Sequence, residues 1–127
     1  MRLGKTLGIL GAVFAAVLIF GTQEVNAQRM ELNWEGRIDD RAELVIRGRS
    51  VRVRTISGQR NRQGSANWSG NPRGNWRPGR ASVNKRSGRG SVRVVKQPSR
   101  SNNYTTIIRI EDLKGGADNY RIRVRWN

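Results

Sequence analysis

Apolar and polar residues alternate along most of this chain, which is the pattern of strands that bury one face. The alternation runs through residues 32–38, 42–46, 51–53, 92–94, 104–110 and 120–126. Successive side chains of a strand point to opposite faces, so a period of two predicts half-buried strands. Beyond the first 27 residues, no stretch shows the period of an amphipathic helix. We therefore predict an all-β fold, a small antiparallel β-sandwich of six or seven strands that is Ig-like or jelly-roll-like.

For one hairpin, the sequence predicts both the turn and the individual residue pairs. The inward positions change from even to odd between Ile46 and Val51, which pairs these two residues across a two-residue loop that begins at Gly48. Glycine at the first loop position is what a type II′ turn requires. The same register places Glu43 opposite Arg54 on the outer face, where opposite charges stabilise the pairing.

Two further turns are predicted from local composition. The adjacent acids Asp39 and Asp40 favour a turn between the first two strands, because Asp is a turn former. A calcium site would need further ligands at loop spacing, and the sequence supplies none there. A second hairpin is expected to join 104–111 to 120–126 through the glycine-containing segment 112–119.

The first 27 residues have the three-part layout of a secretory signal peptide. Arg2 and Lys5 precede a run of 14 apolar or glycine residues at 7–20, and small residues end the segment at Ala27. An uncleaved membrane anchor is the alternative, but a helix needs roughly 20 apolar residues to span a bilayer. Both readings put the rest of the chain outside the cytoplasm. We expect a secreted or periplasmic protein whose mature part, 28–127, is one domain.

Positive charge is concentrated in the middle of the chain. Lys and Arg number 25 against nine Asp and Glu, which gives a formal net charge of +16. Between residues 44 and 110 there are 16 basic residues and no acid. Most are arginines, which form planar bidentate contacts with phosphate, sulfate and carboxylate. Such charge repels itself, so it favours an anionic partner, although a genome-wide codon bias toward Arg would give the same composition.

The segment 59–90 has the composition of a long, flexible basic loop. Its 32 residues include six Gly, two Pro, eight bases and no acid, and we expect one short edge strand in it, at 81–84. Trp68 and Trp76 lie among its arginines. Guanidinium groups pair with anionic oxygens while indoles stack on bases or sugar rings. The alternative is that the two tryptophans fold back over the core.

Two groups of residues are candidates for polyanion binding. One group lies in the basic loop and the other on the outward face of the strands, where it would form one basic plane if the strands lie together, with Arg93 joining it. A row of arginines on a solvated strand can also serve only solubility and protection of the edge. The candidates are Arg73, Trp76, Arg77, Arg80, Arg86 and Arg89 in the loop, and Arg52, Arg54, Arg121, Arg123 and Arg125 on the strands.

The functional prediction follows from what the chain lacks as well as from its charge. With no His and no Cys, it has no Ser-His-Asp triad, no Cys nucleophile and no thiolate or imidazole metal ligand. Nor does it carry a zinc-finger, helix-turn-helix or RNP pattern. A glycosidase-like enzyme would need Glu35 or Glu43 in a cleft, with a second carboxylate about 5–10 Å away.

We therefore expect a non-catalytic exported protein with no cofactor or metal that binds a polyanion. Acidic cell-surface polysaccharide, lipopolysaccharide and extracellular nucleic acid are the expected ligands, and an anionic membrane surface is a further candidate partner. The alternative function is a structural or assembly component of the bacterial cell envelope that binds an acidic protein.

Overall fold

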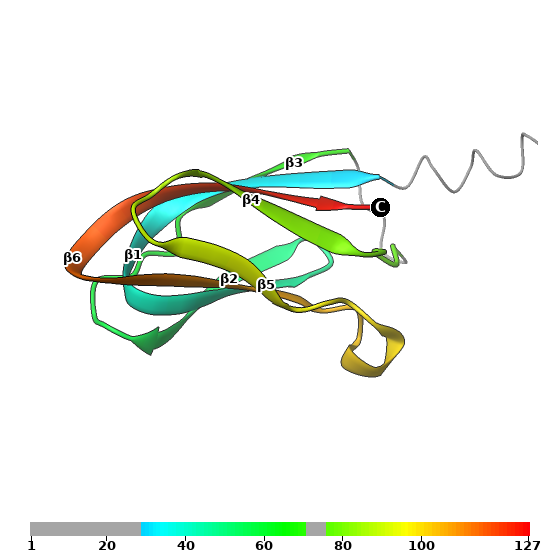
Figure 1. Ribbon diagram of the computed structural model, residues 1–127. Helices are drawn as coiled ribbons and strands as arrows, with labels where there is room; N and C mark the ends of the chain where they lie inside the picture. The colour runs from blue at the N-terminus through cyan, green and yellow to red at the C-terminus, as the bar shows by residue number, and fades with distance from the viewer. Residues whose placement is uncertain (1–28, 71–75) are drawn as a thin grey trace, which may run out of the picture.

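The computed structural model describes residues 29–70 and 76–127, so the predicted signal peptide, 1–27, and Arg73 lie outside the described residues. The described chain forms one antiparallel sheet of six strands (Figure 1), which confirms the all-β prediction. The elements are β1 (Met30–Arg47), β2 (Ser50–Ser57), β3 (Ser65–Ser69), β4 (Ala81–Ser87), β5 (Ser91–Lys96), the 3₁₀ turn η1 (Arg100–Asn102) and β6 (Thr106–Trp126).

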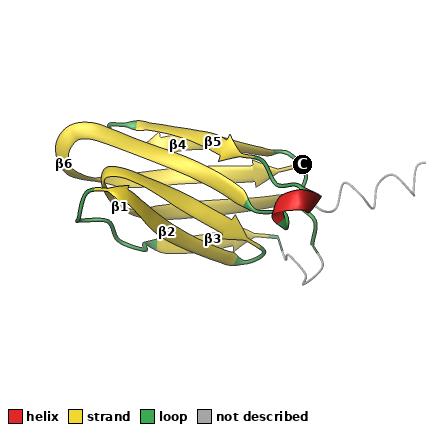
Figure 2. Cartoon of the chain, turned by 90° about the horizontal axis from the view of Figure 1, so that it is seen from below, coloured by secondary structure: helices red, strands yellow, loops and turns green. Residues whose placement is uncertain are grey.

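Strands β1 and β6 are the frame of the molecule. They pair along their whole lengths, from Met30 opposite Trp126 to Ile46 opposite Thr106. Both bend midway, so the sheet folds back on itself (Figures 1 and 2). The upper half of the folded sheet in Figure 1 has the strand order β3-β1-β6-β4, and the lower half has the order β2-β1-β6-β5. These two halves face one another across the core.

Each bend lies where a turn was predicted. The predictions of a turn at Asp39 and Asp40 and of a hairpin through 112–119 are wrong, because β1 and β6 continue through these positions. In β1 the register shifts between Asp39 and Asp40, and Asp40 has a φ of +66°. In β6 the matching irregularity takes up residues 113–116. Asp and Gly are common both in turns and in bulges that bend a strand without ending it, so composition did not distinguish the two.

The predicted turn and residue pairs of the β1–β2 hairpin are confirmed. Ile46 pairs with Val51 and Glu43 pairs with Arg54, as the alternation requires. Gly48 has a φ of +59°, whereas the second loop residue does not have a positive φ. This is the conformation of a type II′ turn, whose twist matches that of the flanking strands.

The core lies between the two halves of the sheet and is closed at the open end, opposite the bends, by three tryptophans. Trp68 stacks on Trp126, with ring centroids 5.5 Å apart. Trp76 contacts both rings edge-on, and its ring centroid lies 5.9 Å from that of Trp68 and 5.3 Å from that of Trp126. The buried Trp126 indole donates to Thr106 Oγ1 at 3.0 Å. The alternative in which Trp68 and Trp76 fold back over the core is therefore the observed one.

Two strands occupy 12 of the 32 residues of the predicted basic loop. Segment 59–90 contains β3 and β4, and β4 confirms the predicted edge strand at 81–84 and extends it to Ser87. Both strands lie at edges, where one ladder of backbone hydrogen bonds suffices. Their small polar residues face outward while Trp68 and Val83 pack against the core. A segment poor in apolar residues can therefore still form strands at an edge.

Two glutamine side chains occupy the places of missing strands at the sheet edges. The Gln63 amide accepts from the Val53 N–H of β2 at 2.8 Å and donates to the Val53 carbonyl at 3.1 Å. Gln97 binds Ala81 of β4 in the same way, at 2.7 and 2.9 Å. Trp34 Nε1 holds the Gln63 backbone carbonyl at 3.0 Å. These paired contacts copy the hydrogen bonds of a neighbouring strand and so cover the edges.

Candidate functional site

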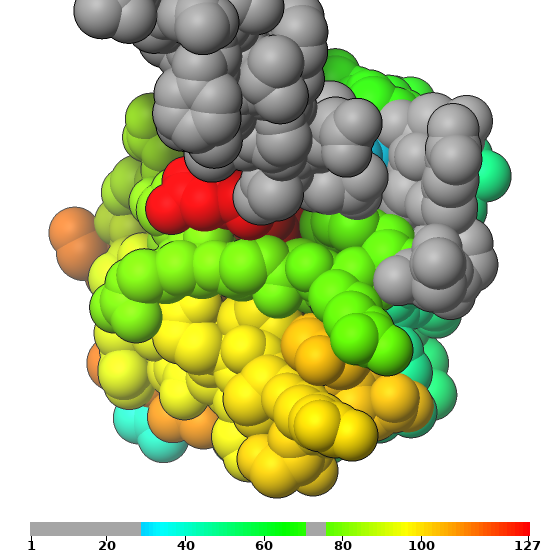
Figure 3. All heavy atoms as spheres, turned by 90° about the vertical axis from the view of Figure 1, so that its right-hand side faces the viewer, coloured from blue at the N-terminus to red at the C-terminus, as the bar shows by residue number. Residues whose placement is uncertain are grey.

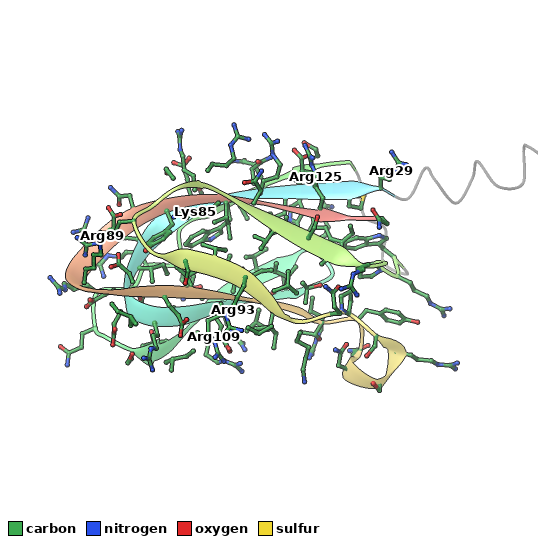
Figure 4. All side chains as sticks on the ribbon, viewed as in Figure 1. Arg29, Lys85, Arg89, Arg93, Arg109 and Arg125 are labelled. Atoms are coloured by element: carbon green, nitrogen blue, oxygen red, sulfur yellow. The ribbon has the colours of Figure 1, made fainter. Side chains whose placement is uncertain are left out.

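The bends divide the predicted basic plane between two sides of the molecule. Arg52 and Arg54 belong to β2, which pairs with the second half of β1. Arg121, Arg123 and Arg125 belong to the second half of β6, which pairs with the first half of β1. Figure 4 shows the separation, with Arg125 on the upper side and Arg93 and Arg109 on the lower side. The strand arginines therefore do not form one plane.

The more basic of the two surfaces is the lower face, which we define as the outward side chains of β2, β5, the second half of β1 and the first half of β6. It carries seven basic residues against two acids, an excess of five positive charges. Its bases are Arg41, Arg47, Arg52, Arg54, Arg93, Lys96 and Arg109, and its acids are Glu43 and Glu111. Four of these bases were not among the binding residues predicted from the sequence: Arg41, Arg47, Lys96 and Arg109. The alternation itself could have found Arg109, because it lies between the inward residues Ile108 and Ile110.

One cross-strand row organises the lower face. The row consists of four outward residues that lie side by side on neighbouring strands: Arg54 on β2, Glu43 on β1, Arg109 on β6 and Arg93 on β5. Glu43 accepts hydrogen bonds from Arg54 Nη2 and from Arg109, whose Nη2 and Nε lie at 2.7 and 3.1 Å. Burial of Glu43 would raise its pKa, but these hydrogen bonds outweigh burial and hold the pKa below its ordinary value of 4.5. Glu43 therefore stays ionised and fixes two of the guanidinium groups.

The other end of this row is not neutralised. Arg93 lies directly opposite Arg109, and Glu43 binds Arg54 and Arg109 but not Arg93. Within 29–70 and 76–127, no acid lies within 4.0 Å of Arg93, Arg52 or Lys96. Like charges directly opposite one another on neighbouring strands are destabilising. The row thus holds a repulsive pair that a bound anion would relieve.

A small apolar strip lies beside the charged row. Val45 and Ile107 are paired neighbours on the lower face, and both are only half-buried. Arg52 flanks the strip on β2 and Lys96 flanks it on β5. The lower face can therefore contact both anionic groups and the apolar parts of a ligand.

The three upper arginines of β6 lie close to acids. Arg125 Nε donates to Glu31 at 2.9 Å, Arg123 lies 3.5 Å from the same carboxylate, and Arg121 Nε lies 3.3 Å from Glu35. The hydrogen bond from Arg125 is the main cause that lowers the pKa of Glu31. These cross-strand pairs set three arginines against two carboxylates, so the three side chains keep an excess of only one positive charge.

Two of the predicted loop residues, Arg89 and Trp76, make contacts within the fold. Arg89 Nε donates to both oxygens of Asp112 at 2.9 and 3.0 Å, and Nη2 donates to the carbonyls of Gly115 and Gly116. This clamp spans the bend of β6 and raises the pKa of Arg89 above its ordinary value. Trp76 is buried in the aromatic cluster that closes the core, so its ring is not presented to a ligand.

The remaining loop candidates stay at the surface. Arg77 and Arg80 are exposed at the open end, where the Arg77 guanidinium lies 6.0 Å from the centre of the Tyr104 ring. Figure 3 looks at this end and shows the green segment after residue 75 crossing in front of the yellow residues of β5. Arg86 is exposed on β4, on the upper side. These three arginines therefore do not join the lower row.

The described residues contain no group of three His, Cys, Asp or Glu side chains that could hold a metal ion. Asp39 is one of the two adjacent acids that raise the question of a calcium site. Its carboxylate accepts hydrogen bonds from the Arg60 side chain and from the backbone N–H groups of Gln59 and Arg60. Those contacts, led by the Arg60 side chain, lower the pKa of Asp39. No helix within the described ranges is long and apolar enough to cross a membrane.

Comparisons with protein-family models, curated proteins and solved structures gave no match to this chain.

Proposed function

We propose that this protein is an exported, non-catalytic β-sandwich that binds polyanions through its lower face. The observation that carries the proposal is the opposition of Arg93 and Arg109 without an acid beside Arg93. An unrelieved like-charge pair costs stability in the free protein. A ligand with closely spaced anionic groups would remove that cost on binding.

The arrangement suits a linear polymer. Neighbouring strands lie about 4.8 Å apart, and alternate residues of a strand about 7 Å apart, so the bases form a regular grid. Glu43 holds Arg54 and Arg109 in place, while Arg93, Arg52 and Lys96 have no acid partner among the described residues. Arginine can grip phosphate, sulfate or carboxylate with two parallel hydrogen bonds. Acidic cell-surface polysaccharide, lipopolysaccharide and extracellular nucleic acid all carry such groups.

A second candidate function is an envelope component that binds an acidic protein. The apolar strip of Val45 and Ile107 within the basic surface favours it, because protein interfaces combine an apolar centre with a polar rim. Addition of a partner strand is disfavoured where Gln63 and Gln97 cover the edges. An acidic partner would therefore dock on the face and not on a sheet edge.

The test is binding to duplex DNA over a range of salt concentrations. The variant Arg52→Ser/Arg93→Ser removes two charges from the lower face, and Arg121→Ser/Arg125→Ser removes two from the upper side. If both lower-face arginines contact phosphates, the first variant should reduce the slope of log K against log salt by about 1.8. The control should change the slope less. Equal losses would mean that net charge alone drives binding, which would refute the assignment of the face.

The proposed export has its own measurement. Mass spectrometry of the protein isolated from its host should find a mature N-terminus at Gln28 and the protein outside the cytoplasm. A cytoplasmic protein that retains Met1 would overturn this part of the proposal.

A further inference from the structure

The upper side of the sheet contains a hollow of about 220 Å³, which is lined by Asn33, Trp34, Glu35, Asn67, Arg86, Arg121, Ile122 and Arg123. It lies over the strands β3, β1, β6 and β4, away from the lower face. Pockets for drug-sized ligands typically measure about 300–1,000 Å³, so this hollow suits one small unit of a larger molecule.

A β-bulge brings one guanidinium to the wall of the hollow. The register between β4 and β6 shifts between Lys85 and Ser87, so Arg86 is the extra residue of the bulged strand. Bulges commonly redirect a side chain beside a functional site. Arg86 is exposed, and no acid among the described residues lies within 4.0 Å of it. Its charge is therefore available to a ligand.

The floor of the hollow holds a second guanidinium in a fixed position. Arg123 is only 26% exposed and lies 3.5 Å from Glu31. Its Nε donates to Asn33 Oδ1 at 3.4 Å, and Asn33 Nδ2 donates to Glu31 at 3.2 Å. This chain of contacts orients Arg123 before any ligand arrives, which reduces the entropy lost on binding.

The opposite wall has a different chemistry. Asn67 lies directly across from Asn33 on β3, and its amide offers both a donor and an acceptor. Glu35 adds a carboxylate that is 57% exposed and is bound on one oxygen by Arg121. A sulfate ion has no hydrogen to donate to Glu35. A ligand with one carboxylate and several hydroxyls can place a hydroxyl against Glu35, which accepts a hydrogen bond from it, while the carboxylate meets the arginines.

We propose that this hollow binds one hexuronate unit of an acidic saccharide. Arg86 and Arg123 receive the sugar carboxylate, and Asn67 and Glu35 bind its hydroxyls. Trp34 is 1% exposed beneath the floor, so the unit is recognised through hydrogen bonds and not by stacking. The inference does not rest on the proposed function of the lower face, since the two surfaces lie on opposite sides of the folded sheet.

The test is an NMR titration of the purified protein with tri-galacturonate at about 0.3 M salt, where electrostatic attraction over long distances is screened. The backbone amides of Asn33, Asn67 and Arg123 should shift, and neutral tri-galactose should bind at least tenfold more weakly. Arg86→Ala and Asn67→Ala should each weaken binding at least tenfold. Asn84→Ala is the matched control, because Asn84 lies in the same cross-strand row but does not line the hollow.

Several results would overturn the proposal. They are equal binding of the neutral sugar, equal binding of sulfate alone, unchanged affinity in Arg86→Ala and Asn67→Ala, or shifts confined to the lower face. Arg52→Ser/Arg93→Ser separates the two proposals. It should leave the tri-galacturonate shifts of Asn33, Asn67 and Arg123 unchanged even though it weakens DNA binding. A failure of DNA binding alone leaves the proposal for the hollow unaffected.

Discussion

Arg89 and Asp112 form the polar clamp of the β6 bend, with Arg89 Nε 2.9 Å from one carboxylate oxygen of Asp112 and 3.0 Å from the other. The Asp112 side chain is fully buried, whereas that of Arg89 is 39% exposed. The carboxylate therefore depends on this single guanidinium for its countercharge.

Arg89→Ala should strongly destabilise the protein, because removing one partner of such a pair leaves a buried charge without compensation. We expect thermal unfolding at least about 10 °C below that of the wild type. The control is Arg86→Ala on β4, whose side chain makes no ion pair among the described residues and should leave the midpoint unchanged. Similar midpoints for the two variants would show that the clamp is dispensable.

Stability should fall in acid as Glu43 becomes protonated. The pKa of Glu43 is lower in the folded chain than its ordinary value of 4.5, because Arg54 and Arg109 overcome the effect of burial. Its ionised form thus stabilises the fold fully above pH ~4.5, and this stabilisation is lost as the pH falls through the folded pKa. Urea unfolding should give a constant free energy between about pH 6 and 7 and a declining one below pH ~4.5.

Glu43→Gln should be less stable than the wild type at pH 7 and should show a weaker decline in acid. Asp39, whose pKa Arg60 lowers, would account for part of the remaining decline. An acid profile that does not change in Glu43→Gln would contradict this role of the carboxylate.

Removal of either glutamine that covers an edge should lower stability and promote association. Gln63→Ala and Gln97→Ala each delete two hydrogen bonds to a strand backbone. We expect a loss of about 1–3 kcal/mol, as two hydrogen bonds of about 0.5–1.5 kcal/mol each imply. The exposed edge should also increase light scattering during unfolding. Gln59→Ala, whose side chain makes no hydrogen bond among the described residues, should change neither quantity.

Arg93→Ser should raise stability while it weakens polyanion binding. It removes the repulsion with Arg109, and the gain should be a few tenths of a kcal/mol. Chemical unfolding at low salt and DNA binding by the same variant measure the two effects. A loss of stability in Arg93→Ser would show that the arginine pair is not a repulsive contact.

Trp76→Phe tests whether the buried indole contributes to binding. Trp76 Nε1 is buried without a hydrogen-bond partner among the described residues, so the substitution removes an unsatisfied donor. We expect the loss of stability to stay below the roughly 3–5 kcal/mol of a buried Trp→Ala truncation, because Phe keeps most of the ring. DNA affinity should not change. A clear loss of affinity would show that Trp76 contributes to binding after all.

The β1–β2 hairpin could be predicted because its signals are local. Gly48 and the alternation around Ile46 fix both the turn and the register within ten residues. The bends could not be predicted, since they depend on the pairing of β1 with β6 and on contacts such as that of Arg89 with Asp112. The turn-forming residues at these points are equally common in bulges.

In the candidate site, too, the features set by neighbouring residues could be predicted, whereas those set by pairing between distant segments could not. Alternation identified Arg52, Arg54 and Arg93 as outward-facing, and the structure brings these three to one face. It could not reveal which other arginines share that face, because the bends decide this. The pairing of Arg125 with Glu31 joins residues 94 positions apart, so charge counts along the chain did not show that the outward arginines of β6 lie beside acids.

The full-length pairing of β1 with β6 also has a consequence for how the chain acquires its structure. Strand β1 cannot complete its central hydrogen-bond ladder until residues 106–126 are available. Contacts between such distant segments form slowly, because a long loop must close before they stabilise anything. A chain that emerges from its N-terminus, as on the ribosome, would therefore leave β1 without its main partner until its last strand is available.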